Sequence, residues 1–508
     1  MPTNKARGRV SLVGAGPGDP GLLTLRAAEL LADADVLLYD ALVGEAILAR
    51  APATCERVFV GKRGGDHAMA QREIEMLMIR EAAEGKHVVR LKGGDPLVFG
   101  RGAEEAQALR AAGIPFEIAP GISSALAGPA YAGIPVTHRA HNVAFTVATG
   151  HEDPGKAAST LDWAKLADPH RTLIFLMAAA HLDAIARQLV EHGLSAATPA
   201  AIVQDATRPS QRTVVGTLDT IAGAAARANV AAPAVLIVGE VVGLRAEIRW
   251  FEDLPLFGKR VLVTRPAEDA QAFASALLAC GAEPILAPVL VIEPPDDPTA
   301  AASALDELHE YRWLVFTSRH GVDALFAQLR AQGVDARYLG GVKIAAIGPK
   351  TKARLESYGI RPEVTPAEFV GEAIARALID AAAPGDRVMI YRAQEARDTL
   401  PRMLAGAGLL PTIVPAYRTV IVEDAAFAEK TARANVFTFA NAAAARAFQT
   451  LLGGPERAVA AARDKTIACI GPIAAQAARD IGLHVDVTAD TYTIEGLIDA
   501  LAAHFAAQ

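Results

Sequence analysis

Short β-branched runs alternate with alanine- and leucine-rich stretches along the chain. Two of these stretches, Leu22–Leu31 and Glu104–Ala112, have the spacing of amphipathic helices. Five apolar runs are compact enough to predict buried parallel strands, at Val10–Val13, Val36–Tyr39, Val88–Leu91, Leu173–Leu176 and Val235–Val238. The alternation predicts an α/β protein built from β-α units.

The alternation is interrupted between Arg249 and Lys259, and a new strand is predicted to begin at Arg260. Each half is about a quarter-thousand residues long, which is enough for two lobes. The junction 251–257 contains Phe, Leu and Pro, whereas a flexible tether would be rich in Gly and Ser. We therefore expect this linker to pack against a domain surface and to set the relative orientation of the halves.

The C-terminal half contains an internal duplication. Ile344–Pro349 (IAAIGP) returns 123 residues later as Ile467–Pro472 (IACIGP), and a second offset of 127 residues pairs Gly258 with Gly385. The duplication predicts two similar α/β lobes with a ligand site in the cleft between them. The N-terminal half shows no comparable repeat.

Composition narrows the class of protein. Of the 508 residues, 52% are hydrophobic and 21% charged, which excludes a disordered chain, and the net charge of −7 argues against a nucleic-acid coat. The three cysteines form no C-x-x-C pair, so neither a disulfide framework nor a cysteine zinc site is predicted. No apolar stretch is long enough for a bilayer. We expect a soluble, cytoplasmic protein that binds neither nucleic acid nor membrane.

A glycine loop, Gly14–Asp19, follows a predicted strand, and Asp40 closes the next strand at about the distance of a dinucleotide-binding fold. Two residues oppose NAD binding. Pro17 removes an N–H from the loop, and Asp19 places a carboxylate where a third glycine belongs. The loop is therefore interpreted as a different kind of ligand loop, and NAD is not expected.

Two more loops have chemistry suited to a ligand. Residues 92–96 (KGGDP) place paired glycines after a predicted strand, where the backbone can press against a ligand. Residues 120–124 (PGISS) open a helix whose free N–H groups can receive a carboxylate. Taken singly, each also fits an ordinary turn between a strand and a helix.

Together these segments resemble the tetrapyrrole methylases, and within them uroporphyrinogen-III C-methyltransferase. The resemblance covers residues 8–250 and rests on GAGPGDPGLLTLRA (14–27), YDALV (39–43), VGKRGG (60–65), RLKGGDPLVFGRGAEE (90–105), PGISSALAGPAYAGIPVTHR (120–139) and TGH (149–151). It implies a two-lobed methylase fold, a homodimer formed through this half, and S-adenosyl-L-methionine as methyl donor, without a metal. It also implies two methyl transfers to uroporphyrinogen III, giving precorrin-2.

The resemblance also assigns residues. The implied cofactor contacts are Pro17, Gly93, Gly94, Asp95, Val98, Ser123, Ser124, Met177 and Ala206. The position of Ala206 is usually glycine, so its methyl group is expected to narrow the pocket. Asp40 is the candidate base for the pyrrole proton, and Lys62 the candidate proton donor or charge partner. Because the substrate carries eight acidic arms, the cations beside the loops are expected to bind it: Arg63, Lys92, Arg101 and Arg139.

The C-terminal half resembles uroporphyrinogen-III synthase. The resemblance rests on RVLVTRP (260–266), VFTSRHGV (315–322), AAIGPKT (345–351), IYRAQEARDTL (390–400), AYRT (416–419) and CIGP (469–472). It implies a bilobed Rossmann-like fold over 258–508, with lobe one formed by 258–290 plus 420–508 and lobe two by 291–419. The implied reaction is cyclisation of hydroxymethylbilane with inversion of ring D. The implied contacts are Arg265, Thr317, Ser318, Thr351, Arg392 and Arg397.

Alternatives stay open at this point. Thr317 and Ser318 also suit a helix N-cap. The 123 offset places Ala440 and Asn441 opposite them, and Ala474 stands where the family commonly has threonine, so hydroxyl groups are lost. The C-terminal half could then be a non-catalytic tetrapyrrole-binding module.

The N-terminal half could also be a methylase acting on a later precorrin, although Tyr39–Asp40 and Lys62–Arg63 argue against that. Because no dehydrogenase–ferrochelatase module is recognised, neither NAD-dependent oxidation nor iron insertion is expected. Use in sirohaem or cobalamin synthesis, and channelling of the intermediate, are left open.

Overall fold

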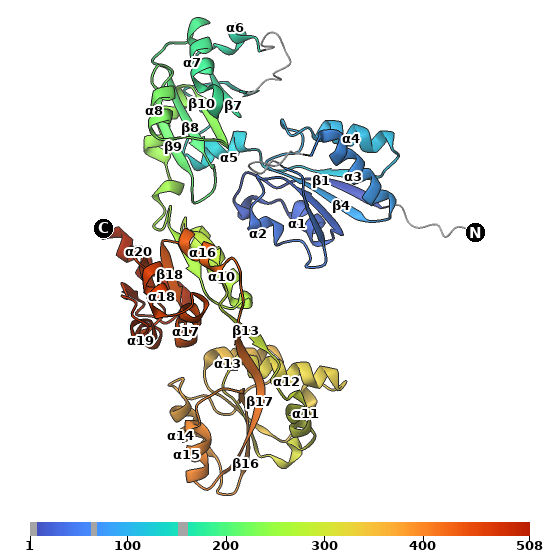
Figure 1. Ribbon diagram of the computed structural model, residues 1–508, viewed down its shortest axis with the longest axis vertical. Helices are drawn as coiled ribbons and strands as arrows, with labels where there is room; N and C mark the ends of the chain where they lie inside the picture. Colours follow the sequence, from blue (N-terminus) through green and yellow to red (C-terminus); the bar gives the residue numbers. More distant parts are fainter. Residues whose placement is uncertain (1–7, 62–68, 151–160, 508) are drawn as a thin grey trace, which may run out of the picture. The chain divides into compact units, whose positions relative to one another are not determined.

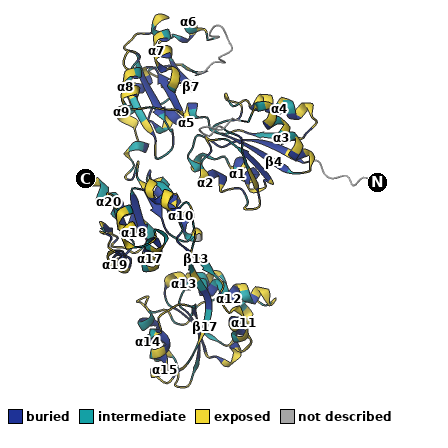
Figure 2. Cartoon of the chain, viewed as in Figure 1, coloured by how far each residue is buried: buried dark blue, intermediate teal, exposed yellow. Residues whose placement is uncertain are grey.

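The computed structural model describes residues 8–61, 69–150 and 161–507 (Figure 1). The chain divides into two compact units. The first holds the residues up to 260, 277–283 and those from 505 onward, and the second holds 261–276 and 284–504. In both units the strands are largely buried and the helices are exposed along one side (Figure 2). The predicted α/β class is confirmed.

The first sheet is parallel throughout, in the order β3-β2-β4-β1-β5. Its central strand β4 is buried at every position. Since all its strands run the same way, the loops that follow them gather at one edge of the sheet. The elements are β1 (Arg9–Gly14), η1 (Pro20–Leu22), α1 (Leu25–Ala32), β2 (Val36–Tyr39), α2 (Glu45–Leu48), β3 (Glu56–Phe59), α3 (Gln71–Ala83), β4 (His87–Lys92), α4 (Gly102–Ala111) and β5 (Phe116–Ala119).

The second sheet, in the order β6-β7-β10-β8-β9, is mostly antiparallel, and only β6 and β7 run in parallel. The elements are α5 (Ser124–Tyr131), β6 (Ala144–Thr149), α6 (Trp163–Leu166), β7 (Arg171–Leu176), η2 (Ala179–His181), α7 (Leu182–Glu191), β8 (Pro199–Gln204), β9 (Arg212–Thr217), α8 (Ile221–Arg227), β10 (Ala234–Val238), η3 (Glu240–Leu244), α9 (Arg245–Ile248) and η4 (Phe251–Asp253).

The third sheet has the order β12-β11-β18-β19-β20, with parallel pairing from β11 to β20. Its strands come from the two ends of the C-terminal half. The elements are β11 (Arg260–Val263), α10 (Ala267–Ala279), β12 (Glu283–Leu286), α16 (Phe427–Arg433), β18 (Val436–Phe439), α17 (Ala442–Leu451), α18 (Pro455–Ala461), β19 (Thr466–Cys469), α19 (Pro472–Asp480), β20 (Val487–Thr488) and α20 (Ile494–Ala506).

The fourth sheet has the order β13-β17-β16-β14-β15, in which β13 alone is antiparallel to its neighbour. Residue 290 belongs to strand β13 of this sheet, and residues 420 and 421 belong to strand β17. The lobe boundaries expected at 290/291 and 419/420 therefore fall within these two strands. The elements are β13 (Leu290–Glu293), α11 (Pro298–Asp306), η5 (Leu308–Glu310), β14 (Trp313–Phe316), α12 (Arg319–Ala331), η6 (Ala336–Leu339), β15 (Lys343–Ala346), α13 (Pro349–Ser357), α14 (Gly371–Ala381), β16 (Arg387–Ala393), α15 (Thr399–Gly406) and β17 (Leu410–Ile421).

The duplicated sequence forms duplicated structure. The repeated glycine-proline pair starts α13 in one copy and α19 in the other. In the first copy Ile344 N donates to Glu363 Oε2 at 2.6 Å, and in the second Ile467 N donates to Asp486 Oδ2 at 2.8 Å. The donor and the acceptor of the second copy each follow their counterpart in the first copy by 123 residues. The predicted internal duplication is thus confirmed.

Some sequence expectations need correction. Val235–Val238 is buried as expected, but β10 pairs antiparallel with both neighbours. Continuous apolar character reports burial on both faces and not strand direction. The helix expected from Leu22 begins at Leu25, because Thr24 Oγ1 accepts from Ala27 N and caps it.

The junction 251–257 is packed. Phe251 is 4% exposed and Leu256 is fully buried. The Phe251 ring meets the Tyr131 ring edge-on, with centroids 4.8 Å apart. The segment packs against the first unit, as its apolar composition predicts, whereas its effect on the orientation of the halves stays a prediction.

Candidate functional site

Three loops at the carboxyl edge of the first sheet press together backbone to backbone. A Cβ atom added to Gly14 would lie 2.4 Å from Gly121 N, and one added to Gly121 would lie 2.1 Å from Gly94 O. Gly94 N also donates to Gly16 O at 2.7 Å. Only glycine allows this approach, so the three loops that looked ordinary singly form one structure.

Asp95 ties these loops together. Its Oδ2 accepts from Gly121 N at 3.1 Å and its Oδ1 accepts from Leu97 N at 2.8 Å. Next to it, Gly94 (φ 68°) carries no side chain, and a Cβ there would find nothing closer than Ser123 Cα at 3.8 Å. The loop at Gly94 therefore forms a cradle of bare backbone beside the first turn of α5, which suits a polar ligand.

The other implied cofactor contacts lie on loops of both sheets. Val98 and Met177 are exposed, at 38% and 46%, and Met177 has a left-handed backbone (φ 58°). Ala206 is 7% exposed and lies in an apolar cluster, and a Cβ on Gly128 would be 3.5 Å from its methyl group. This methyl group packs toward α5, and its expected effect on the width of the cofactor pocket stays a prediction.

Asp40 lies half-buried directly after β2. Its Oδ1 accepts a hydrogen bond from Leu42 N at 3.0 Å, which fixes the side chain within its loop. This loop role and a role as base are compatible, because one carboxylate has several acceptor positions. Lys62 and Arg63, the other predicted site residues of this region, lie outside the described residues.

Lys92, which was expected to bind the acidic substrate, is buried. It is 5% exposed, and its Nζ lies 3.0 Å from Oε1 of the fully buried Glu105. Arg90 Nε approaches the same oxygen at 3.2 Å, and Gln71 donates to it. Burial, followed by the neighbouring Arg90, lowers the pKa of Lys92. Lys92 belongs to a buried ion cluster and is not an open cation for substrate.

Arg101 and Arg139 are exposed. Arg101 pairs with Glu104 across one helical turn, with both side chains about half accessible. An exposed pair of this kind exchanges partners at little cost. Both arginines therefore stay available for an acidic ligand.

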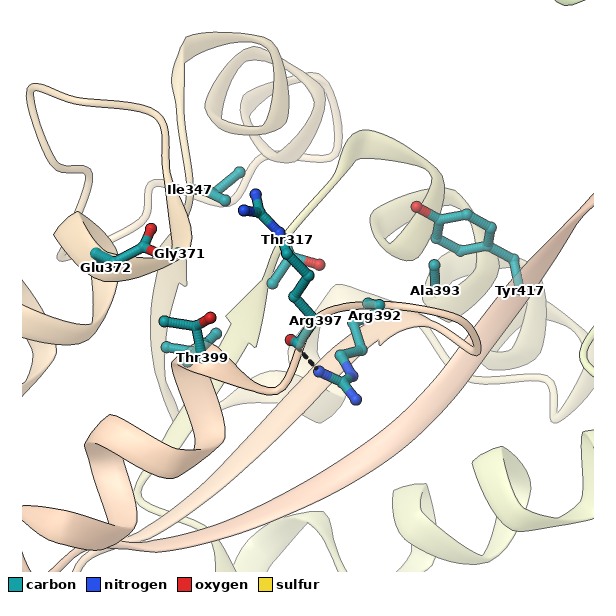
Figure 3. Close-up of a pocket in the computed structure, with 11 residues that line it drawn as sticks. Thr317, Ile347, Gly371, Glu372, Arg392, Ala393, Arg397, Thr399 and Tyr417 are labelled. Carbon is teal, nitrogen blue, oxygen red and sulfur yellow. Dashed lines mark hydrogen bonds between the residues drawn. The ribbon is translucent and has the colours of Figure 1, made fainter. Parts of the chain in front are cut away.

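A pocket of about 250 Å³ opens in the second unit, at the carboxyl ends of β14 and β16 (Figure 3). Arg397 reaches across it toward Ile347, whereas the Arg392 guanidinium turns to its own loop and donates to Arg397 O at 2.8 Å. The lining residues are Thr317, Ile347, Gly371, Glu372, Arg392, Ala393, Ala396, Arg397, Thr399, Leu400 and Tyr417.

Tyr417 contributes a phenol to this pocket. It is 9% exposed, and its hydroxyl lies 2.8 Å from Ser318 Oγ. Burial raises the pKa of Tyr417, so the phenol keeps its proton at neutral pH. Ser318 also caps α12 by accepting from Gly321 N, which confirms the N-cap interpretation. Thr317 lines the pocket, whereas the Ser318 hydroxyl contacts Tyr417 and caps α12.

Two other predicted contacts lie elsewhere. Thr351 is 4% exposed on α13 and is not among the lining residues. Arg265 pairs with Asp269, which also accepts from Arg319. Burial opposes the charge on Asp269, but the two arginines outweigh it and hold its pKa below the usual range. Arg265 is therefore part of a structural ion cluster.

The structure accounts for two of the three positions that lack a hydroxyl; the third, Ala440, is the counterpart of Thr317, which lines the pocket. Ala474, the counterpart of Thr351, is 2% exposed, so the position is buried in both copies. Asn441, the counterpart of Ser318, accepts from Ala444 N at 2.8 Å and caps α17 in the same way. The counterparts Thr351 and Ser318 are not among the residues that line the pocket in the first copy.

Other site classes find no support in the part of the chain that the structure describes. Over these residues, no three or more His, Cys, Asp or Glu side chains gather as a metal site would require. Over the same residues, every helix is too short or too polar to cross a bilayer.

Comparisons with known proteins match the two halves of the chain to two different families. Residues 9–222 match the model of the tetrapyrrole (corrin/porphyrin) methylases, and residues 271–499 match that of uroporphyrinogen-III synthase HemD. The porphyrin biosynthesis protein HemD of Ruminiclostridium josui is 36% identical over 503 residues, which are 97% of each chain. The chain belongs to this family of fused tetrapyrrole methylase–uroporphyrinogen-III synthase proteins.

Other relatives match one half. The S-adenosyl-L-methionine-dependent uroporphyrinogen III methyltransferase of Methanosarcina barkeri is 53% identical over 47% of this chain and 93% of its own. The siroheme synthase of Azotobacter vinelandii is 51% identical over 49% of this chain and 53% of its own. The present chain thus spans about half the length of that siroheme synthase. Both matches cover about as much of the chain as the methylase half.

Four residues with central places were missed by sequence reasoning. Tyr417 and Glu105 stand inside motifs that were recognised, so their place in the motif was a usable signal. Tyr131 also stands inside a recognised motif, residues 120–139, but its contact with Asp19 is distant in sequence. Glu252 acts through contacts with Gln211 and Thr213, and no motif marks it. The binding and catalytic roles of the other predicted site residues remain predictions.

Proposed function

We propose that this chain closes hydroxymethylbilane to uroporphyrinogen III and then transfers two methyl groups from S-adenosyl-L-methionine to it, giving precorrin-2. The observation that carries the proposal is the end-to-end match with a single porphyrin biosynthesis protein. It supports the joint presence of both activities in one chain. A homodimer through the methylase half and a cytoplasmic location stay predictions, which light scattering and fractionation can test.

The methylase residues fit the cofactor. The bare cradle at Gly94 and the start of α5 offer N–H groups and room for a polar ligand, and the exposed Met177 and Val98 offer apolar contact. When bound, S-adenosyl-L-methionine supplies a methyl group that is already activated by its sulfonium, so the protein mainly aligns the two reactants. The exposed Arg101 supports binding of acidic side arms.

Asp40 is proposed to take the proton that leaves the methylated ring. Asp40→Asn keeps the acceptor for Leu42 N but removes the base, so methyl transfer should slow by about 10²–10⁴-fold. Mass spectrometry of the product from uroporphyrinogen III, with calorimetry of S-adenosylhomocysteine binding, measures both properties. Collapse of cofactor affinity together with the rate would make Asp40 a binding residue. Absence of any methyl gain with the native chain would favour a methylase for a later precorrin.

In the synthase half, the pocket at Arg397 is smaller than the roughly 300–1,000 Å³ of sites that enclose a drug-sized ligand. It is therefore proposed to hold one acidic arm or one ring of the linear tetrapyrrole. Thr317, Arg397 and the protonated Tyr417 provide donors there. Holding one end of the chain in place restricts the geometry in which the macrocycle closes, which excludes direct closure.

The test gives the full chain hydroxymethylbilane without methyl donor and identifies the isomer by chromatography. Type III product above the spontaneous rate would support synthase activity. Arg397→Gln should lower this rate, whereas Arg402→Gln, on the exposed side of α15, should not. Type I product alone would favour the non-catalytic binding module, for which the buried Ala474 and the capping Asn441 give little reason.

A further inference from the structure

The junction contains a carboxylate that is held by the methylase half. Glu252 lies on η4 with its side chain 15% exposed. Its Oε1 accepts from Gln211 Nε2 at 2.9 Å and from Thr213 Oγ1, and its Oε2 pairs with Arg245. Three donors to one largely buried carboxylate make a strong, well-defined contact. The neighbouring Asp253 pairs only at the surface, with Arg249.

Gln211 connects Glu252 to the loop that follows β8. Gln211 is 3% exposed, and its Oε1 accepts from Thr207 N at 2.8 Å. Thr207 Oγ1 in turn accepts from Asp19 N at 3.0 Å, in the glycine loop after β1. Asp205 and Thr207 have φ of 48° and 69°, a left-handed conformation that non-glycine residues rarely adopt. Such a loop keeps its conformation only while its surroundings hold it.

Tyr131 makes a second connection between the junction and the glycine loop. Its hydroxyl donates to Asp19 Oδ2 at 2.7 Å. Its ring meets Trp250 and Phe251 edge-on, with centroids 4.9 Å and 4.8 Å away, and the Trp250 indole N–H donates to Ala130 O. Burial, followed by Asp19, raises the pKa of Tyr131, so the hydroxyl stays a donor. Asp19 is thus held through its N–H and its carboxylate.

We propose that the junction residues 250–252 position the methyl-donor site, with Glu252 and Tyr131 as positioning residues that hold loops 14–19 and 205–208 in one arrangement. This inference rests on the proposed function, because it takes S-adenosyl-L-methionine to bind at these loops. If the loops are released, only a fraction of molecules offers a formed site. The apparent dissociation constant of the cofactor then rises by the inverse of that fraction.

The test compares full-length variants. Tyr131→Phe keeps the ring contacts but removes the bond to Asp19, and Glu252→Ala removes the contact with Gln211, which Glu252→Gln partly restores. Loss of a hydrogen bond to a charged group shifts an equilibrium by roughly tenfold or more. We therefore expect Tyr131→Phe and Glu252→Ala to weaken S-adenosylhomocysteine binding about tenfold, with the KM for uroporphyrinogen III unchanged. Asp253→Asn, the control, should bind like the native chain.

The possible outcomes distinguish a failure of the positioning role from a failure of the proposed function. A selective loss of cofactor affinity, with rescue by Glu252→Gln, supports the positioning role. Unchanged affinity in both variants, while the native chain binds the cofactor, overturns it. A parallel loss of melting temperature and of affinity for both substrates also overturns it, because that pattern reports general loosening. A native chain that binds no S-adenosylhomocysteine would instead contradict the proposed function.

Discussion

Glu105→Gln would remove a carboxylate that faces two buried cations in the methylase half. Glu105 is fully buried, with its Oε1 3.0 Å from Lys92 Nζ and 3.2 Å from Arg90 Nε. The preceding residue, Glu104, offers a matched control, since its pair with Arg101 lies at the surface. The two substitutions are chemically identical and adjacent, and the sites differ in burial and in the number of cations that face the carboxylate.

The magnitudes follow from that difference. Breaking a buried ion pair costs about 3–5 kcal/mol because it leaves an uncompensated charge, whereas an exposed pair contributes about 0–1 kcal/mol. At about 1.4 kcal/mol per factor of ten, local opening of β4 should become about 10²- to 4 × 10³-fold more frequent in Glu105→Gln. In Glu104→Gln the increase should stay below about fivefold.

The defect should also depend on pH. Burial first, and Arg90 second, lower the pKa of Lys92, while Glu105 opposes that lowering. Without Glu105 the folded pKa of Lys92 falls further below its unfolded value, so the unfolded chain binds more protons and stability rises with pH. The defect is complete below the folded pKa of Lys92 in the variant and shrinks as pH rises toward the folded pKa in the native chain, above which Lys92 is neutral in both folded proteins.

Hydrogen exchange of peptides from β4 and α4 in the full chain measures local opening without assuming two-state unfolding of a multidomain protein. Measurements at pH 7 and 9, corrected for intrinsic exchange, give both predicted quantities. Equal effects of the two substitutions, or a Glu105→Gln defect that grows as pH rises, would refute the reasoning.

Three further predictions follow from single contacts. Lys86 first, and then Arg80, hold the pKa of Glu81 below its usual range. The stability that this contributes is present above the unfolded value of about pH 4.3 and is lost as pH falls through the folded value, so the melting temperatures of Glu81→Gln and the native chain should converge as pH falls below that value. Tyr417→Phe removes the hydroxyl bonded to Ser318 and should slow macrocycle closure about tenfold at unchanged melting temperature, whereas an unchanged rate would exclude the phenol from the reaction. Asn441→Ala should destabilise the synthase half by about 1 kcal/mol in thermal melts and Asn441→Ser should restore it, unless the cap is without effect.

The class of fold, the duplication and the ligand loops of the methylase half could be predicted from the amino-acid sequence alone. These features are local: a buried strand needs a continuous apolar run, and a loop that must pass close to another backbone needs glycine at a fixed place, as at Gly14, Gly94 and Gly121. The same reasoning predicted a packed junction, since Phe251 and its neighbours are too apolar to be left in water.

Which polar side chains are open to a ligand could be seen only in the folded structure. Lys92 and Arg101 look alike in the sequence, but Lys92 meets Glu105 in the interior while Arg101 stays at the surface. The folded structure also shows that β10 runs antiparallel, and that Tyr131 reaches Asp19, 112 positions away in the sequence. Burial, strand direction and long-range hydrogen bonds depend on what surrounds a residue in space, and residue type and local spacing do not carry that information.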